Sequence, residues 1–203
     1  MEQIERIKRA RKHLLLDKPF YGFQLVKYPL IEDNSIKTAS TNGKWIKFNP
    51  QFIKTLTNKQ IQTVLVHEAR HINELHHLRR QGRDCQLWNE ACDHNINSSL
   101  IYNERFEKID IILLDSQYTG MSPEQIYSKI RRHNEQNKRN AGTGQGSNEE
   151  KQNKESGDTT GSTGNSGQVP DKDKQNGNKG AEYIGIGDIE DAPAGTNINE
   201  EAN

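Results

Sequence analysis

The chain is poor in the residues that build a large hydrophobic core. Of its 203 residues, 31% are hydrophobic and 6% are aromatic, too little apolar surface to offset the entropy that the whole length would lose on folding. We therefore expect part of the chain to be disordered. No apolar run approaches the roughly 20 residues that span a bilayer, and residues 1–10 carry charges throughout instead of a signal-peptide core. These features predict a cytoplasmic protein.

Cysteine is also scarce. The two cysteines, Cys85 and Cys92, lie seven positions apart and form no CxxC pair. This spacing argues against the disulfide framework of a small secreted domain. We expect both to be reduced thiols.

The formal net charge of zero hides two parts of opposite sign. Residues 1–140 contain 23 Lys and Arg against 16 Asp and Glu (+7), whereas residues 141–203 contain 5 against 12 (−7). The stretch from about 140 to 179 consists almost wholly of small polar and charged residues, which is typical of flexible linkers. We predict a folded domain over 1–138, a disordered polar linker over 139–180 and a short acidic segment over 181–203, suited to act as a docking peptide.

Hydrophobic periodicity predicts an α+β domain. Residues 2–15 have the apolar spacing of a helix, and residues 20–31 are rich in the aromatic and branched side chains of a strand. Asn42-Gly43 is turn chemistry within a hairpin over 38–49. Residues 44–48 alternate strictly after this turn, which predicts a half-buried edge strand.

Four further helices follow, each opened by a recognisable cap. The first cap is followed by Pro at the first helical position, and two others have the capping-box form. The helices are expected over about 50–56, 58–80, 85–102 and up to 134, with caps at Asn49, Thr57, Asp84 and Ser122. The tight turn between the second and third of them favours antiparallel packing of these two helices.

The long helix contains His67-Glu68-Ala69-Arg70-His71, an HExxH motif. The i, i+4 spacing puts both imidazoles on one helix face, where they can chelate one tetrahedral zinc ion. We predict that His67 and His71 bind one zinc ion per chain and that Glu68 acts as the general base in the hydrolysis of an amide bond.

Zincin enzymes present substrate in extended form along an edge strand. The strand immediately upstream of the motif is the natural candidate, and a purely structural role for it is the alternative. Its residues are Lys44, Trp45, Ile46, Lys47 and Phe48.

A catalytic zinc ion needs a third protein ligand. His77 stands ten residues after His67, the spacing of metzincins, but position 74 is Glu instead of the Gly at which their helix breaks. In an unbroken helix His77 points away from His67 and His76 points to the opposite side. These two histidines are therefore expected to be solvated or to support the ligands, and Glu74 is placed to hydrogen-bond His71.

The next helix offers a better donor. Asn89, Asp93 and Asn97 recur at i, i+4 and i+8, and Asp93 is the only carboxylate of this polar stripe. We predict Asp93 as the third ligand. Glu90 is the alternative, because Asn89-Glu90 is similar to the NE pair of thermolysin-like enzymes. If Asp93 only hydrogen-bonds a ligand imidazole, Asn89 and Asn97 would brace neighbouring backbone.

Together these motifs resemble a metallopeptidase domain of bacterial and phage proteins that normally precedes a von Willebrand factor A-like domain. The resemblance covers roughly residues 5–135 and implies a zincin-like fold: a small mixed sheet with an edge strand, packed on the HExxH helix, and an antiparallel ligand helix. It also implies a site carried by His67, Glu68, His71 and Asp93. The matching elements are Thr41-Asn-Gly-Lys, Asn49-Pro50, the HExxH motif, His76-His77-Leu-Arg79-Arg80, Arg83-Asp84 and Trp88-Asn89-Glu-Ala-Cys-Asp93-His-Asn-Ile-Asn97.

The sequence departs from the family in two places. Leu75 stands where relatives often have Gly before the paired histidines. The sequence also ends where the A-like domain would begin, so we expect a von Willebrand factor A-like partner.

Hydrolysis of a peptide or protein substrate is the favoured function. The alternative is a non-catalytic, zinc-stabilised interaction module, for which Glu68 would be dispensable. Nucleic-acid binding is not favoured, because the cluster of Arg79, Arg80 and Arg83 has no interleaved aromatic residues. A basic face of the domain could instead hold the acidic tail.

Overall fold

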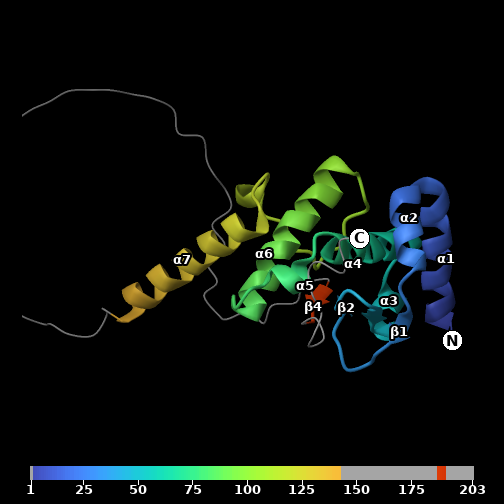
Figure 1. Cartoon of the computed structure of the whole chain (residues 1–203), viewed down its shortest axis with the longest axis horizontal. Coiled ribbons are helices and arrows are strands. Elements are labelled where there is room, and N and C mark those ends of the chain that lie inside the picture. The colour runs from blue at the N-terminus through green and yellow to red at the C-terminus, as the bar shows by residue number, and fades with distance from the viewer. Residues whose placement is uncertain (1, 143–186, 191–203) are drawn as a thin grey trace, which may run out of the picture.

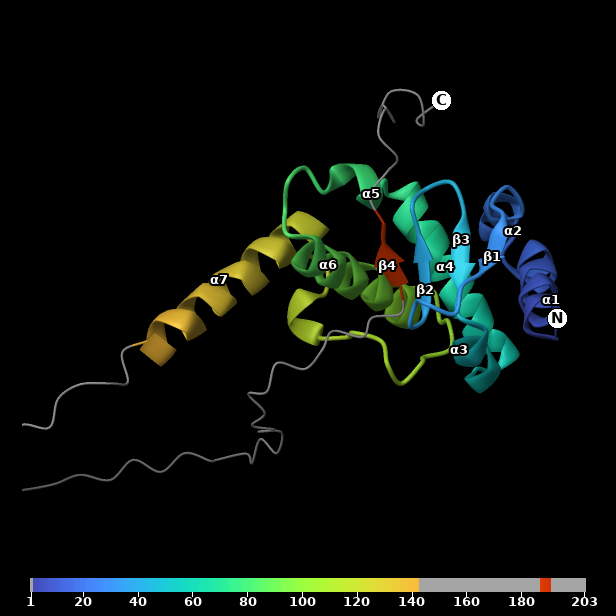
Figure 2. The same ribbon diagram turned by 90° about the horizontal axis from the view of Figure 1, so that it is seen from below.

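The computed structural model describes residues 2–142 and 187–190. A small sheet lies beside helix α4, with α1 and α2 towards one end of the domain and α6 and α7 towards the other (Figures 1 and 2). The α+β class predicted from the sequence is confirmed. The elements are α1 (Glu2–Asp17), α2 (Pro19–Val26), β1 (Leu30–Glu32), β2 (Ala39–Thr41), β3 (Ile46–Phe48), α3 (Pro50–Thr55), α4 (Asn58–Asn73), α5 (His76–Arg79), α6 (Cys85–Ser98), the π-helical turn η1 (Ser99–Asn103), the 3-10 helix η2 (Ser116–Tyr118), α7 (Pro123–Gly142) and β4 (Gly187–Ile189).

Two helices form the N-terminal part, where one helix and one long strand were expected. The first helix is confirmed as α1, but most of the expected strand over 20–31 is helix α2, and β1 is only three residues long. Pro19 begins α2, as proline favours a first helical turn. Gly22 then lets α2 approach α1 closely, because a Cβ at this position would lie 2.5 Å from the Leu15 Cα. Phe20, Tyr21 and Phe23 thus belong to a helix, and Tyr28 follows it.

The sheet has the strand order β1-β3-β2-β4. The predicted hairpin is confirmed: β2 and β3 pair antiparallel, and Gly43 in the turn has a φ of 90°. The predicted edge position of residues 44–48 is wrong, because β3 pairs with β2 on one side and, in parallel, with β1 on the other. Strict alternation gives the burial pattern of a strand but does not show how many neighbours pair with it.

The fourth strand comes from the distant C-terminal segment. β4 pairs in parallel with β2, with Gly187 opposite Ala39 and Ile189 opposite Thr41. Figure 2 shows β4 between β2 and α6. Most of the predicted acidic segment 181–203 and most of the predicted linker 139–180 lie outside the described residues, but residues 139–142 of that linker belong to α7.

Helix α4 begins at its predicted capping box and ends earlier than predicted. Thr57 and Gln60 cap the start, as expected. The helix ends at Asn73 instead of near residue 80, because Leu75 adopts the left-handed conformation with a φ of 53°, and α5 then begins a new direction. Glycine adopts such a conformation without strain, whereas leucine rarely does. The prediction of a helix that continues to about residue 80, which the Glu at position 74 favoured, is therefore wrong.

The later helices begin where predicted and differ at their ends. Asn49 and Asp84 cap α3 and α6, and Ser122 and Gln125 form the predicted capping box of α7. α6 becomes π-helical after Ser98, and α7 continues to Gly142 instead of ending near 134. α4 and α6 contact each other, and their axes are inclined to one another in Figures 1 and 2. Among the described residues, no helix is both long and apolar enough to cross a bilayer.

The core has two parts. The larger part is formed by residues of helices α1, α2, α3 and α4, of the sheet and of the end of α6. The smaller joins α6 to α7 and contains Trp88, Ala91, Cys92, Ile126, Tyr127, Ile130 and the β4 residue Ile189. Both cysteines are free thiols, as predicted: Cys85 is exposed, and burial raises the pKa of Cys92.

Two glycines with positive φ provide a matched test of packing behind the hairpin. A Cβ at Gly43 would lie 2.5 Å from Nε2 of the buried His77, whereas a Cβ at Gly82 would meet nothing within 4 Å. We expect Gly82→Ala to lower the free energy of unfolding by about 1 kcal/mol, the backbone cost alone, and Gly43→Ala by roughly 2–4 kcal/mol. Urea denaturation measures both, and equal losses would contradict the assigned position of His77.

Candidate metal centre

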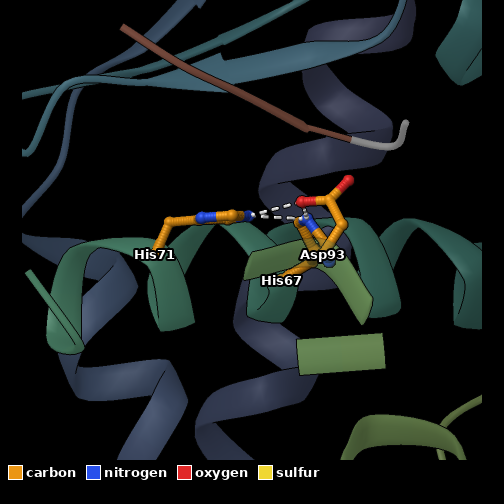
Figure 3. Close-up of side chains that lie close together, drawn as sticks. All are labelled: His67, His71 and Asp93. Atoms are coloured by element: carbon orange, nitrogen blue, oxygen red, sulfur yellow. Dashed lines mark hydrogen bonds and ion pairs between the residues drawn. The ribbon is translucent and has the colours of Figure 1, made fainter. Parts of the chain in front are cut away.

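Two helices bring His67, His71 and Asp93 together, as shown in Figure 3. The two Nε2 atoms lie 2.8 Å apart. Oδ1 of Asp93 lies 3.3 Å from Nε2 of His67 and 3.1 Å from Nε2 of His71. All three side chains are almost wholly buried, with exposed fractions of 0–1%. Two imidazoles and a carboxylate therefore direct their donor atoms at one small volume inside the protein.

This donor set fits a divalent metal ion. Ligand atoms about 2.0–2.1 Å from a tetrahedrally coordinated ion lie about 3.3 Å from one another, close to the three separations between His67, His71 and Asp93. The protonation states also fit. Burial lowers the pKa of His71 to about 3. Burial alone would raise the pKa of Asp93, but His67 and His71 hold it well below its ordinary value. A neutral imidazole and an ionised carboxylate are the forms that bind metals.

Each histidine of the cluster is oriented by a neighbouring side chain. Oδ1 of Asn97 lies 3.0 Å from Nδ1 of His67, and Nδ2 of Asn97 donates to the Leu113 carbonyl. Because the amide nitrogen is used in this way, the amide oxygen is left to accept from Nδ1–H of His67, and Nε2 then carries the free lone pair. The sequence placed Asn97 beside the site, and the structure gives it this contact.

His71 is oriented by His76, which the sequence reasoning placed on the opposite side of the helix. The left-handed residue Leu75 turns the chain back, so Nδ1 of His76 lies 3.2 Å from Nδ1 of His71. Glu74 contacts Nε2 of His76 at 3.2 Å and so reaches His71 only through that ring. Burial would raise the pKa of Glu74, but His76 and Arg70 lower it to about 2.

Two of the other candidates lie outside the cluster of three ligands. His77 is buried against the Gly43 turn. Glu90 is half-buried, and burial, reinforced by Asp93, raises the pKa of its carboxyl group.

Glu68 is fully buried and lies beside the cluster. A Cβ built on Gly187 would be 2.5 Å from Oε1 of Glu68 and 3.1 Å from Nε2 of His67, so the carboxylate, the ring and β4 meet at one point. Sequence reasoning did not connect residue 187 with the site. Ile184, Ile186 and Ile189 are the sequence feature that distinguishes this segment from the polar stretch before it.

The predicted substrate strand is not the strand nearest the metal cluster. Both edges of β3 are paired with other strands. The strand beside the cluster is β4, which pairs with β2 on one edge and is hydrogen-bonded by Asn89 on the other. Nδ2 of Asn89 donates to the Gly187 carbonyl at 2.7 Å, and Oδ1 accepts from the Ile189 N–H at 3.0 Å. Asn89 thus braces backbone, which was one of the roles considered for it.

Comparison with known families agrees with this site. A family model described as "Putative metallopeptidase domain" matches residues 2–185. The chain belongs to this family. Its membership confirms the resemblance seen in the motifs, and with the buried cluster of potential ligands it supports a metal-dependent peptidase.

Relatives of this metallopeptidase-domain protein add little about its role. An uncharacterized protein of Thermotoga maritima is 28% identical over 105 residues, which cover 48% of this chain and 26% of the relative. The match thus spans about a quarter of that protein's length. No solved structure matches the chain.

Proposed function

We propose that this protein is a zinc-dependent peptidase with a zincin-like active site. The observation that carries the proposal is the meeting of His67, His71 and Asp93 at one point, with the buried carboxylate of Glu68 beside them. Two histidines and one carboxylate are a ligand set that catalytic zinc sites use, with one coordination position left for water or substrate. Nitrogen donors favour zinc over magnesium or calcium, which prefer oxygen.

Each side chain of the site has a separate role in the proposed hydrolysis. When bound, zinc would supply Lewis acidity at the substrate carbonyl. Glu68 accepts a proton from the attacking water and delivers it to the leaving amine. Asn97 and His76 hold the two ligand imidazoles in the tautomer and direction that metal binding needs.

The direct test measures zinc and cleavage together. The purified chain should bind one zinc ion, and the zinc-loaded protein should cleave members of a peptide library, with activity lost on chelation and restored by zinc. Because β4 lies against Glu68, the same assay should include Gly187→Val, whose side chain leaves no room for β4 there. If the protein binds no zinc, the proposal fails.

A second function is favoured by one observation, the complete burial of the ligands and Glu68. A closed metal site is typical of structural zinc, which supplies folding energy. The protein would then be a zinc-stabilised interaction module, working with a von Willebrand factor A-like or other partner. Zinc binding without cleavage, in both the unsubstituted chain and Gly187→Val, would favour this function over the first.

A further inference from the structure

β4 is held along both of its backbone edges, directly beside the metal centre. One edge pairs with β2, and the ladder continues to the Glu190 N–H, which donates to the Thr41 carbonyl at 2.9 Å. The other edge is held by the two hydrogen bonds of Asn89. Backbone pairing with an exposed strand is how many domains bind extended peptides. We call this surface, formed by β2, Asn89 and the residues that contact β4, the β4 site.

The β4 site also discriminates between side chains. At position 187 it favours glycine, because a Cβ would lie 2.5 Å from Oε1 of Glu68 and 3.1 Å from Nε2 of His67, so that a buried side chain would have to move. At position 189 it buries an isoleucine. The Ile189 side chain is only 7% exposed and packs against apolar residues of α6 and α7. At position 190 it binds a carboxylate: Oε1 of Glu190 accepts from Oγ of Ser40 at 3.1 Å and lies 3.4 Å from Nζ of Lys47.

We propose that the β4 site is a peptide-binding site that takes an extended segment with glycine beside the metal, an aliphatic residue two positions later and an acidic residue next. Residues 187–190 occupy it as an internal pseudo-substrate and keep other peptides out. The description as pseudo-substrate rests on the proposed function, whereas the binding itself requires no catalysis.

Physical reasons favour self-occupation. Any carbonyl that Glu68 helps to hydrolyse must reach the place where Gly187 now lies, so β4 and a substrate exclude each other. A segment tethered to its own binding site acts at an effective concentration in the millimolar range. If a free peptide binds the open site with a Kd of about 10 μM, the tethered segment would weaken that binding about 100-fold.

The test uses a fluorescent peptide with the sequence of residues 183–193 and the full-length, zinc-loaded chain. Gly187→Val should displace β4, and fluorescence anisotropy should then show peptide binding at least tenfold tighter than in the unsubstituted chain. Ile189→Asp offers a second way to displace β4 if the first variant folds poorly. Gly82→Val is the matched control, because it strains a positive-φ glycine whose Cβ would meet nothing within 4 Å, and it should leave binding as weak as in the unsubstituted chain.

Recognition is tested with altered peptides and an altered site. Peptides carrying Gly187→Val or Ile189→Asp should bind the opened chain at least tenfold more weakly, and adding Asn89→Ala to that chain should weaken binding of the unaltered peptide. Equal peptide affinity of the opened and unsubstituted chains, or undiminished binding of the altered peptides, would overturn the proposal. Because anisotropy needs no turnover, these outcomes stay separate from a failure to detect peptidase activity.

Discussion

Replacing Glu68 by glutamine should slow peptide hydrolysis by about 10²- to 10⁴-fold while leaving the metal in place. The amide has nearly the size of the carboxylate, so the substitution preserves packing at this fully buried position. It cannot accept the proton of the attacking water, a role that typically contributes about 10²- to 10⁴-fold to the rate. We expect a fall of that size in kcat, with KM nearly unchanged, because the lost interaction acts mainly in the transition state.

The measurement compares Glu68→Gln with the unsubstituted residue in two backgrounds, the natural sequence and Gly187→Val, so that occupation by β4 cannot hide the effect. Zinc per chain and the Tm should stay the same as those of the matching parent. Full activity of a zinc-loaded Glu68→Gln protein would remove the general base from the mechanism.

Replacing Asp93 by alanine should remove the metal itself. Zinc sites in small domains bind with about 10–16 kcal/mol in total, so one of three protein ligands accounts for roughly 3–5 kcal/mol, or two to four orders of magnitude in Kd. The buried Asp93 contacts both histidine ligands. Its loss removes the anionic ligand and leaves two neutral imidazole donors.

Glu90 provides the matched control, because it is the neighbouring carboxylate of α6 and lies outside the cluster. Zinc titration followed by calorimetry should show the affinity collapse for Asp93→Ala and near-normal binding for Glu90→Ala. Zinc at 100 times its Kd should stabilise the folded state by about 2.7 kcal/mol. It should therefore raise the Tm of the Glu90→Ala protein as much as that of the unsubstituted chain. If instead Glu90→Ala loses zinc and Asp93→Ala keeps it, the third ligand has been misassigned.

Local patterns in the sequence were enough for the parts of the fold that depend on near neighbours. The capping boxes at Thr57 and Ser122, the hairpin turn at Gly43 and the i, i+4 histidines are all set by residues a few positions apart. The stripe on α6 also predicted which carboxylate lies beside His67 and His71, because only Asp93 sits on the polar face with Asn89 and Asn97.

The features that sequence reasoning missed depend on tertiary context. A left-handed leucine is disfavoured by local sterics, so the end of α4 could not be read from Leu75, and the place of His76 followed from that error. The edge position of residues 44–48 was wrong because strand neighbours are chosen by long-range pairing. β4 contains only three residues, far from β2 along the chain. Such a short segment has no hydrophobic alternation from which its pairing with β2 could be predicted.

The direction of β4 has a consequence for self-cleavage. A peptide bond is hydrolysed only when its carbonyl oxygen turns towards the electrophile. The Gly187 carbonyl instead turns towards α6 and is engaged by Asn89 at 2.7 Å. Because the Asn89 hydrogen bond occupies this oxygen, we expect hydrolysis of the bond in the resident peptide to be slow. A strand that entered in the opposite direction would exchange the positions of its N–H and carbonyl groups. Strand direction would then distinguish a segment that stays bound from a substrate that is cleaved.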